Sequence, residues 1–197
     1  PASVLTGFGP AFEEPVQRRW TYDELLDAIP ETNQPHELWD GELIWMATPT
    51  PTHQEIVDRL HDALKTWVRA RKLGRTFIAP LDMVLSPHQS HQPDVMFIAA
   101  ARSAVIQDRI RGPVDLAMEV ISPGSRRRDR IDKRDVYQQH GIREYWLVDP
   151  EAGTVEVLFL DGPEYTMTGR WRAGESAESR MLPGFKVEVG QLFNGES

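Results

Sequence analysis

Apolar residues recur at helical spacing over one long stretch of the chain, between Thr52 and Gly74. The residues that share this face are Ile56, Leu60, Ala63, Leu64, Trp67 and Val68. Thr52 and Glu55 have the capping-box spacing that opens a helix, and a glycine such as Gly74 commonly follows a helix end. The pattern predicts one long amphipathic helix.

Shorter apolar runs follow this helix and predict strands, because they are rich in β-branched and aromatic residues and are bounded by turn residues. They lie at about 75–79, 82–86, 93–98, 114–121 and 143–149. A second helix is predicted over 129–140, ahead of the last of these strands, with Gly141 as its stop signal. Helix, several strands, helix and strand is an α/β order.

The remaining elements flank this series. A capping box at Thr21–Glu24 predicts a short helix to about Ile29. Turn dipeptides predict two hairpins, Leu38–Met46 around Asp40-Gly41 and Thr154–Thr168 across Asp161-Gly162. A last strand is expected near 185–189. We expect the hairpins to be additions to one sheet.

Composition favours a single globular domain. The chain has 197 residues, of which 40% are hydrophobic and 26% charged. Residues 1–19 lack periodicity and hold three prolines, so we expect an N-terminal arm followed by one domain over 20–197. The absence of cysteine excludes disulfides, thiolate catalysis and cysteine-based zinc sites. With no signal peptide and no membrane-spanning run evident, we expect a cytoplasmic protein without membrane contact.

Charge gives a divided indication about nucleic acid. The net charge of −8 argues against strong nonspecific DNA binding, which depends on clustered lysine and arginine. Basic residues nevertheless gather in two runs. One holds Arg126, Arg127, Arg128, Arg130, Lys133 and Arg134, and the other holds Arg69, Arg71, Lys72 and Arg75. Each run is either a phosphate-binding patch or a solvated surface.

Two carboxylates are tied to apolar runs. Asp94 leads the run 95–98, and Glu119 interrupts the run 115–123. A charge inside such a run is costly unless it is paired, hydrogen-bonded or bound to a metal. Two acids on neighbouring strands would form a hard oxygen site suited to Mg²⁺ or Mn²⁺. The alternative is an exposed aspartate and an outward-facing glutamate.

Lys133 supports the site interpretation. On the predicted helix it shares one face with Val136, Tyr137 and His140. The lysine would then project inward from a helix that begins near the end of the Glu119 strand. The alternative is a surface pair between Lys133 and Asp129.

Taken in order, these features resemble the PD-(D/E)XK nuclease superfamily, and within it the bacterial "putative restriction endonuclease" proteins of the Uma-two type, a domain of unknown function. The motifs are Glu37-Leu38-Trp39-Asp40-Gly41-Glu42-Leu43 with Met46, His53 at a helix start, Gln92-Pro93-Asp94, Glu119-Val120-Ile121-Ser122-Pro123, Asp129 with Lys133 and Tyr137, Gly141-Ile142-Arg143-Glu144-Tyr145-Trp146-Leu147-Val148-Asp149-Pro150, and Leu182-Pro183-Gly184-Phe185. The resemblance covers roughly residues 20 to 193.

The resemblance implies a restriction-endonuclease-like αβββαβ core with a mixed sheet, and a metal-dependent endonuclease acting on DNA. Asp94 and Glu119 would hold Mg²⁺ or Mn²⁺, with the Val120 carbonyl as a further ligand. Lys133 would position or deprotonate the attacking water. The lysine of the general superfamily pattern stands two residues after the acid, where this chain has Ile121. The resemblance to this branch implies that the lysine is displaced onto the following helix, and Lys133 fits that place.

Further residues carry weaker expectations. Arg126, Arg127 and Arg128 would bind flanking phosphates. Glu37 and His53 match family positions and are candidate accessory residues. Glu37 would be a third acid that binds the metal through water or holds Lys133, and the alternative is a cross-strand ion pair. For His53 the alternative is local capping or a surface position. His88 and His91 lie in a polar stretch that we interpret as a loop.

Two expectations concern partners. The rival function is a catalytically inactive nucleic-acid-binding or protein-interaction module on the same fold. We also expect a homodimer, because the C-terminal strands carry large apolar residues that could lie on an outer face. These residues are Tyr145, Trp146, Leu158, Phe159 and Trp171.

Overall fold

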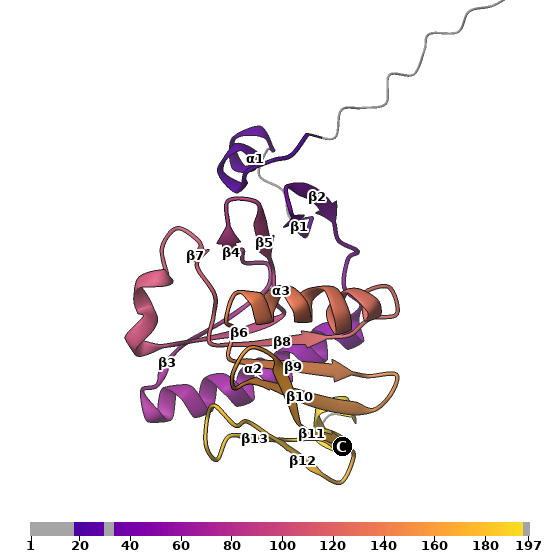
Figure 1. The fold of residues 1–197 in the computed structure, drawn as a ribbon. Coiled ribbons are helices and arrows are strands. Elements are labelled where there is room, and N and C mark those ends of the chain that lie inside the picture. The colour runs from indigo at the N-terminus through magenta and orange to yellow at the C-terminus, as the bar shows by residue number, and fades with distance from the viewer. Residues whose placement is uncertain (1–17, 30–33, 195–197) are drawn as a thin grey trace, which may run out of the picture.

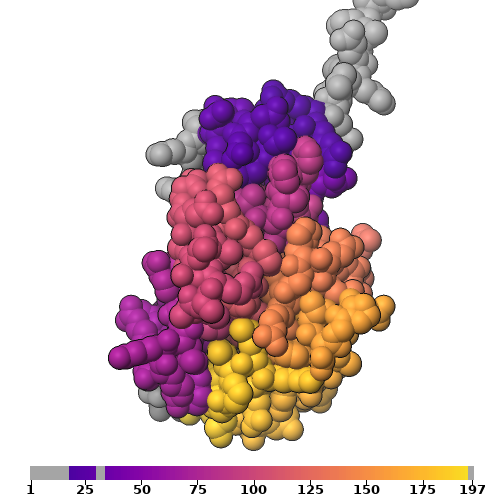
Figure 2. Space-filling model, turned by 60° about the vertical axis from the view of Figure 1, so that its left-hand side comes forward, coloured from indigo at the N-terminus to yellow at the C-terminus, as the bar shows by residue number. Residues whose placement is uncertain are grey.

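The computed structural model describes residues 18–29 and 34–194. Figure 1 shows the N-terminal elements gathered at one end of the molecule and the C-terminal strands at the other, and the same separation is visible on the surface in Figure 2. Of the N-terminal arm expected over 1–19, residues 1–17 lie outside the described residues. Within the described ranges, no helix is both long enough and apolar enough to cross a membrane.

The main sheet has six strands in the order β11-β10-β9-β8-β6-β3. Their bounds are β3 Gly74–Ile78, β6 Val95–Ala99, β8 Leu116–Val120, β9 Glu144–Asp149, β10 Thr154–Leu160 and β11 Tyr165–Arg172. β8 and β9 run parallel, and the other neighbours run antiparallel. With α2 (Pro51–Arg71) before β3 and α3 (Arg134–Gln139) before β9, the elements follow the predicted αβββαβ order on a mixed sheet.

Side chains alternate between the two faces of this sheet, as the pleat requires. On β6, Val95 and Phe97 join the core that includes the apolar side of α2, whereas Met96 and Ile98 join the core that includes Tyr137 of α3. β8 alternates in the same way, with Leu116, Met118 and Val120 in the first core and Ala117 in the second. By this alternation Glu119 belongs to the α3 side.

The helix that carries Lys133 is wound in two ways. Its central turn, Arg128–Lys133, is π-helical, and it continues directly into α3. The helix predicted over 129–140 is therefore present. A π turn is uncommon, and such turns are often found at functional sites.

A second sheet corrects the expectation of additions to one sheet. Its order is β2-β1-β5-β4-β7, so the leading hairpin belongs to a separate layer. The bounds are β1 His36–Trp39, β2 Glu42–Trp45, β4 Met83–Ser86, β5 Gln89–His91 and β7 Ile110–Arg111. The helix α1 (Tyr22–Ala28) buries Tyr22 and Leu25 against Leu38 and Val84 of this layer. That small apolar cluster explains why the hairpin packs here.

Several element boundaries differ from the prediction. The cap of α2 is Thr50, whose hydroxyl accepts from the amide of His53, because Pro51 suits the first helical position. The helix ends at Lys72 in a left-handed conformation with φ 54°, and Gly74 begins β3. The stretch interpreted as a loop around His91 contains β5 instead. The remaining elements are the 3₁₀ turn Ala100–Val105, β12 Ser176–Glu178, β13 Lys186–Glu188 and α4 Val189–Asn194.

The large apolar residues on which the dimer expectation rested pack within a single chain. Tyr145 and Trp146 are fully buried, and Leu158 and Phe159 are nearly so. Trp171 packs partly buried against the α2 side of the core. These residues therefore supply no exposed apolar face, and the homodimer stays a prediction without their support.

Candidate active site

The strand register brings Asp94 and Glu119 together. β6 and β8 pair with Val95 opposite Met118 and Met96 opposite Ala117, so continuing by one residue sets Asp94 opposite Glu119. The amide of Val120 donates to Oδ2 of Asp94 at 2.7 Å. Both carboxylates line one cavity of about 1080 Å³. The alternative in which the two acids face away from each other does not describe this structure.

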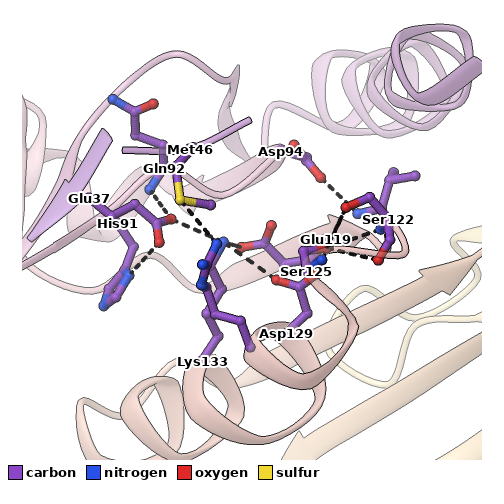
Figure 3. Close-up of polar contacts among 12 residues, drawn as sticks. Glu37, Met46, His91, Gln92, Asp94, Glu119, Ser122, Ser125, Asp129 and Lys133 are labelled. Carbon is purple, nitrogen blue, oxygen red and sulfur yellow. Dashed lines mark hydrogen bonds and ion pairs between the residues drawn. The ribbon is translucent and has the colours of Figure 1, made fainter. Parts of the chain in front are cut away.

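Lys133 points into the same cavity from its helix, as Figure 3 shows. Its Nζ lies 2.8 Å from Oε1 of Glu119, 3.1 Å from Oε1 of Glu37 and 3.7 Å from Oδ1 of Asp129. The lysine side chain is 3% exposed and that of Asp129 is 4% exposed. The pair with Asp129 is therefore a buried contact within a larger cluster and is not a surface pair.

Glu37 reaches this cluster from the second sheet. Its Oε1 accepts from the amide of Gln92 at 3.2 Å, and its Oε2 accepts from Trp39 Nε1 at 3.0 Å. His91 Nδ1 lies 3.5 Å from Oε2. Burial alone would raise the pKa of Glu37, but Lys133 and His91 outweigh it and hold that pKa well below its usual range. Glu37 is thus a charged partner of Lys133, the second of the roles expected for it.

His53 meets the site from the N-terminal end of α2. Its Nε2 lies 3.2 Å from Oδ2 of Asp94. Burial lowers the pKa of His53, but the hydrogen bond and the charge of Asp94 outweigh burial, so the pKa is raised. The Val120 backbone acts on this pKa in the same direction.

Negative charge dominates the cavity. The carboxylates of Glu37, Glu119 and Asp129 contact one lysine, Lys133, and those of Asp94 and Glu151 line the same cavity. Burial and then the neighbouring acids raise the pKa of Glu119 well above 4.5, although Lys133 opposes them. Burial would lower the pKa of Lys133, but the carboxylates beside it raise that pKa, so the ammonium stays charged. A site with this excess of negative charge favours an added cation.

Two tyrosines complete the contacts, and the sequence reasoning did not assign them roles. Tyr137 donates its hydroxyl to Oε1 of Glu119 at 2.8 Å, and Tyr145 donates to the main-chain carbonyl of Asp129 at 2.9 Å. The signal for Tyr137 was its position one helical turn after Lys133. The tyrosine and the lysine together fix one oxygen of Glu119.

The donor set suits a hard divalent cation. Oδ1 of Asp94 and Oε2 of Glu119 take no part in the contacts above. Carboxylate oxygens are ligands that Mg²⁺ and Mn²⁺ prefer. Among the described residues, no group of three or more histidine, aspartate or glutamate side chains is arranged to hold a metal. An ion here would therefore rest on two carboxylates and complete its shell with main-chain oxygen and water.

The three arginines expected to bind phosphate lie in different surroundings. Arg126 pairs with Asp149 at 2.5 Å and with Glu151 at 2.7 Å. Arg127 is exposed, and Arg128 lines the cavity with Nη1 3.1 Å from the sulfur of Met46. Of the three, Arg128 is the one placed to contact a ligand in the cavity.

Comparisons with known proteins identify the family and the fold. A family model named Uma2, described as "Putative restriction endonuclease", matches residues 22–190. No protein with a curated description matches the chain. A solved structure from Anabaena variabilis, described as "a putative nuclease belonging to DUF820", is similar over 89% of this chain and 98% of its own, with a TM-score of 0.74 and 21% identity. At that identity the likeness establishes a shared fold.

Proposed function

Because this chain belongs to the Uma2 family of restriction-endonuclease-like proteins, we propose that it is a divalent-metal-dependent nuclease that hydrolyses phosphodiester bonds in DNA. One observation carries the proposal. Asp94 and Glu119 stand opposite each other in a single cavity, and the ammonium of Lys133 lies 2.8 Å from Glu119. Two acids and one buried lysine on strand, strand and helix can serve phosphoryl transfer.

Asp94 and Glu119 would hold Mg²⁺ or Mn²⁺, and the Val120 carbonyl is the proposed third protein ligand. When bound, such an ion polarises a phosphate oxygen and lowers the pKa of a coordinated water. The hydrogen bonds from Val120, Lys133 and Tyr137 fix the two carboxylates, so that their free oxygens need little reorganisation.

Lys133 acts as a charged donor in this proposal. Its raised pKa keeps the ammonium protonated at neutral pH, so it is poorly suited to remove a proton from water. It is well suited to orient a nucleophile and to stabilise negative charge developing at phosphorus. Glu37 positions it, since that carboxylate contacts Nζ at 3.1 Å from the second sheet. Arg128, and Arg127 beside it, would bind flanking phosphates.

The test is a cleavage assay on circular duplex and circular single-stranded DNA with Mn²⁺ or Mg²⁺. The wild type is expected to cut, and Asp94→Asn and Glu119→Gln are expected to lose about two or more orders of magnitude in rate. Asp135→Asn is the matched control, because its carboxylate is 48% exposed and pairs only with Arg134 among the described residues. Cleavage that survives Asp94→Asn would sink the assignment. A folded, metal-loaded wild type that binds DNA without cutting it would favour an inactive binding module.

A further inference from the structure

The reacting groups lie at the floor of a recess. The side chains of Glu119 and Lys133 are 4% and 3% exposed, and that of Asp94 is 15% exposed. On the basis of the proposed function, we propose that this recess takes a single unpaired strand of nucleic acid, with one base stacked on Trp45 at the rim. Three observations lead to this substrate class.

The first observation is the size of the recess. A cavity of about 1080 Å³ is slightly larger than the pockets that enclose small ligands, which reach about 1,000 Å³. Double-stranded DNA is a stiff rod, and deforming it to press one phosphate onto a recessed floor costs free energy. An unpaired strand bends freely and can lead its backbone inward, so the recess favours a single strand.

The second observation is charge. Among the cavity-lining residues that the structure describes, two basic side chains, Arg128 and Lys133, stand with five carboxylates, those of Glu37, Asp94, Glu119, Asp129 and Glu151. Duplex DNA carries one phosphate charge per about 1.7 Å of its length, and each strand alone carries half that density. The acidic recess, in a chain of net charge −8, therefore repels a duplex more than a single strand. Binding must gain free energy from contacts other than phosphate pairing.

Trp45 is the third observation and offers such a contact. It ends β2 at the cavity lining and is 45% exposed, so its ring is accessible from the cavity. The ring of His36 supports it, with ring centroids 5.5 Å apart and planes inclined by 58°. Trp45, Met46 and Arg128 all line the cavity, and the Met46 sulfur accepts from Arg128 Nη1 at 3.1 Å. An exposed indole beside a phosphate-binding cation is the arrangement by which proteins bind unpaired bases.

The proposal is tested by fluorescence anisotropy with labelled oligonucleotides of about 16 nucleotides, single-stranded and duplex. Binding is measured with Ca²⁺ and again with a chelator, so no turnover is needed. We expect the single strand to bind more tightly than the duplex. Trp45→Ala should weaken single-strand binding about 5- to 100-fold, and Trp45→Phe should keep most of the affinity, because loss of one stacked base has that effect.

Met167→Ala is the matched control, since Met167 is 54% exposed on β11, outside the cavity lining. It should leave both affinities unchanged. Equal affinity for duplex and single strand, or unchanged binding by Trp45→Ala, would overturn the proposal. Binding that depends on Trp45 without any cleavage would refute the nuclease and leave this inference standing. Binding of an RNA oligonucleotide of the same sequence, measured in the same assay, shows whether the protein prefers ribose or deoxyribose.

Discussion

Replacing Lys133 by methionine tests the account of the buried charges most directly. Methionine fills similar volume but leaves Glu37, Glu119 and Asp129 without the ammonium that lies 2.8 to 3.7 Å from them. Removing one partner of a buried ion pair typically costs about 3–5 kcal/mol, because the remaining charge is left unpaired in a poorly solvated place. For a chain of this length that loss lowers the thermal midpoint by about 10 °C.

The loss should depend on pH in a defined direction. Burial raises the pKa of both Glu119 and Asp129, and without Lys133 these pKa values must rise further. An acid whose pKa is raised in the folded state stabilises the fold below its unfolded pKa, and this stabilisation is lost as pH rises through the folded pKa. The variant can therefore neutralise its acids at low pH. The difference from the wild type should be largest at about pH 8 and should shrink toward about pH 5.

The assay is urea unfolding followed by circular dichroism at several pH values. Arg134→Met is the control, since it removes a cation from the next position, where the side chain is 44% exposed. A surface pair of that kind contributes about 0–1 kcal/mol. If Lys133→Met lowers the free energy of unfolding no more than Arg134→Met, or by the same amount at every pH, the description of a buried acidic cluster held by one lysine is wrong.

Three further outcomes are expected. Mn²⁺ at about 100 times its dissociation constant should add about 2.7 kcal/mol to the free energy of unfolding, which raises the thermal midpoint. Asp94→Ala should abolish this rise, and an undiminished rise in the variant would show that the proposed metal site is wrong. Calorimetric titrations should show Mn²⁺ binding more tightly as pH increases. The raised pKa of Glu119 means that this carboxyl group holds a proton, which the ion must displace in order to bind. An affinity independent of pH would contradict this. Lys133→Arg should keep the Mn²⁺ effect and lose most cleavage, since a planar guanidinium cannot replace a compact ammonium; wild-type cleavage would show that shape is unimportant there.

The main sheet was predictable because its signals are local. Apolar runs of strand length and one amphipathic helix specify the αβββαβ order without long-range information. Lys133 could be assigned an inward direction for the same reason, since helical spacing alone sets it on the face of Tyr137. The π turn that carries it left no such signal.

The second sheet was not predicted as a separate sheet, because its central strand β5 is short and polar. β5 consists of Gln89, Ser90 and His91, and no apolar alternation marks it. His91 is buried there by pairing with β4 and by its approach to Glu37, residues that the sequence alone does not bring together. Strands of this kind are defined by their partners, which lie far away along the chain.

The arginine run shows the same limit in electrostatics. From the sequence it was either a phosphate-binding patch or a solvated surface. The structure instead pairs Arg126 and Arg130 with Asp149, and Arg130 with the buried Glu156. These acids belong to β9 and β10, so the helix is fixed to the sheet by part of the run. Arg128 alone among these three lines the cavity.

The pairing of β6 with β8 has a consequence for how the chain can vary in length. Because strand side chains alternate, a shift of one residue between these strands would send Asp94 to the opposite face from Glu119. An inserted or deleted residue just before β6 or within β8 would therefore separate the two acids. The short exposed connection 107–108, between the 3₁₀ turn 100–105 and β7, lies outside that register. Related proteins should tolerate length changes there, and a tag or reporter inserted in that connection should leave the two carboxylates facing each other.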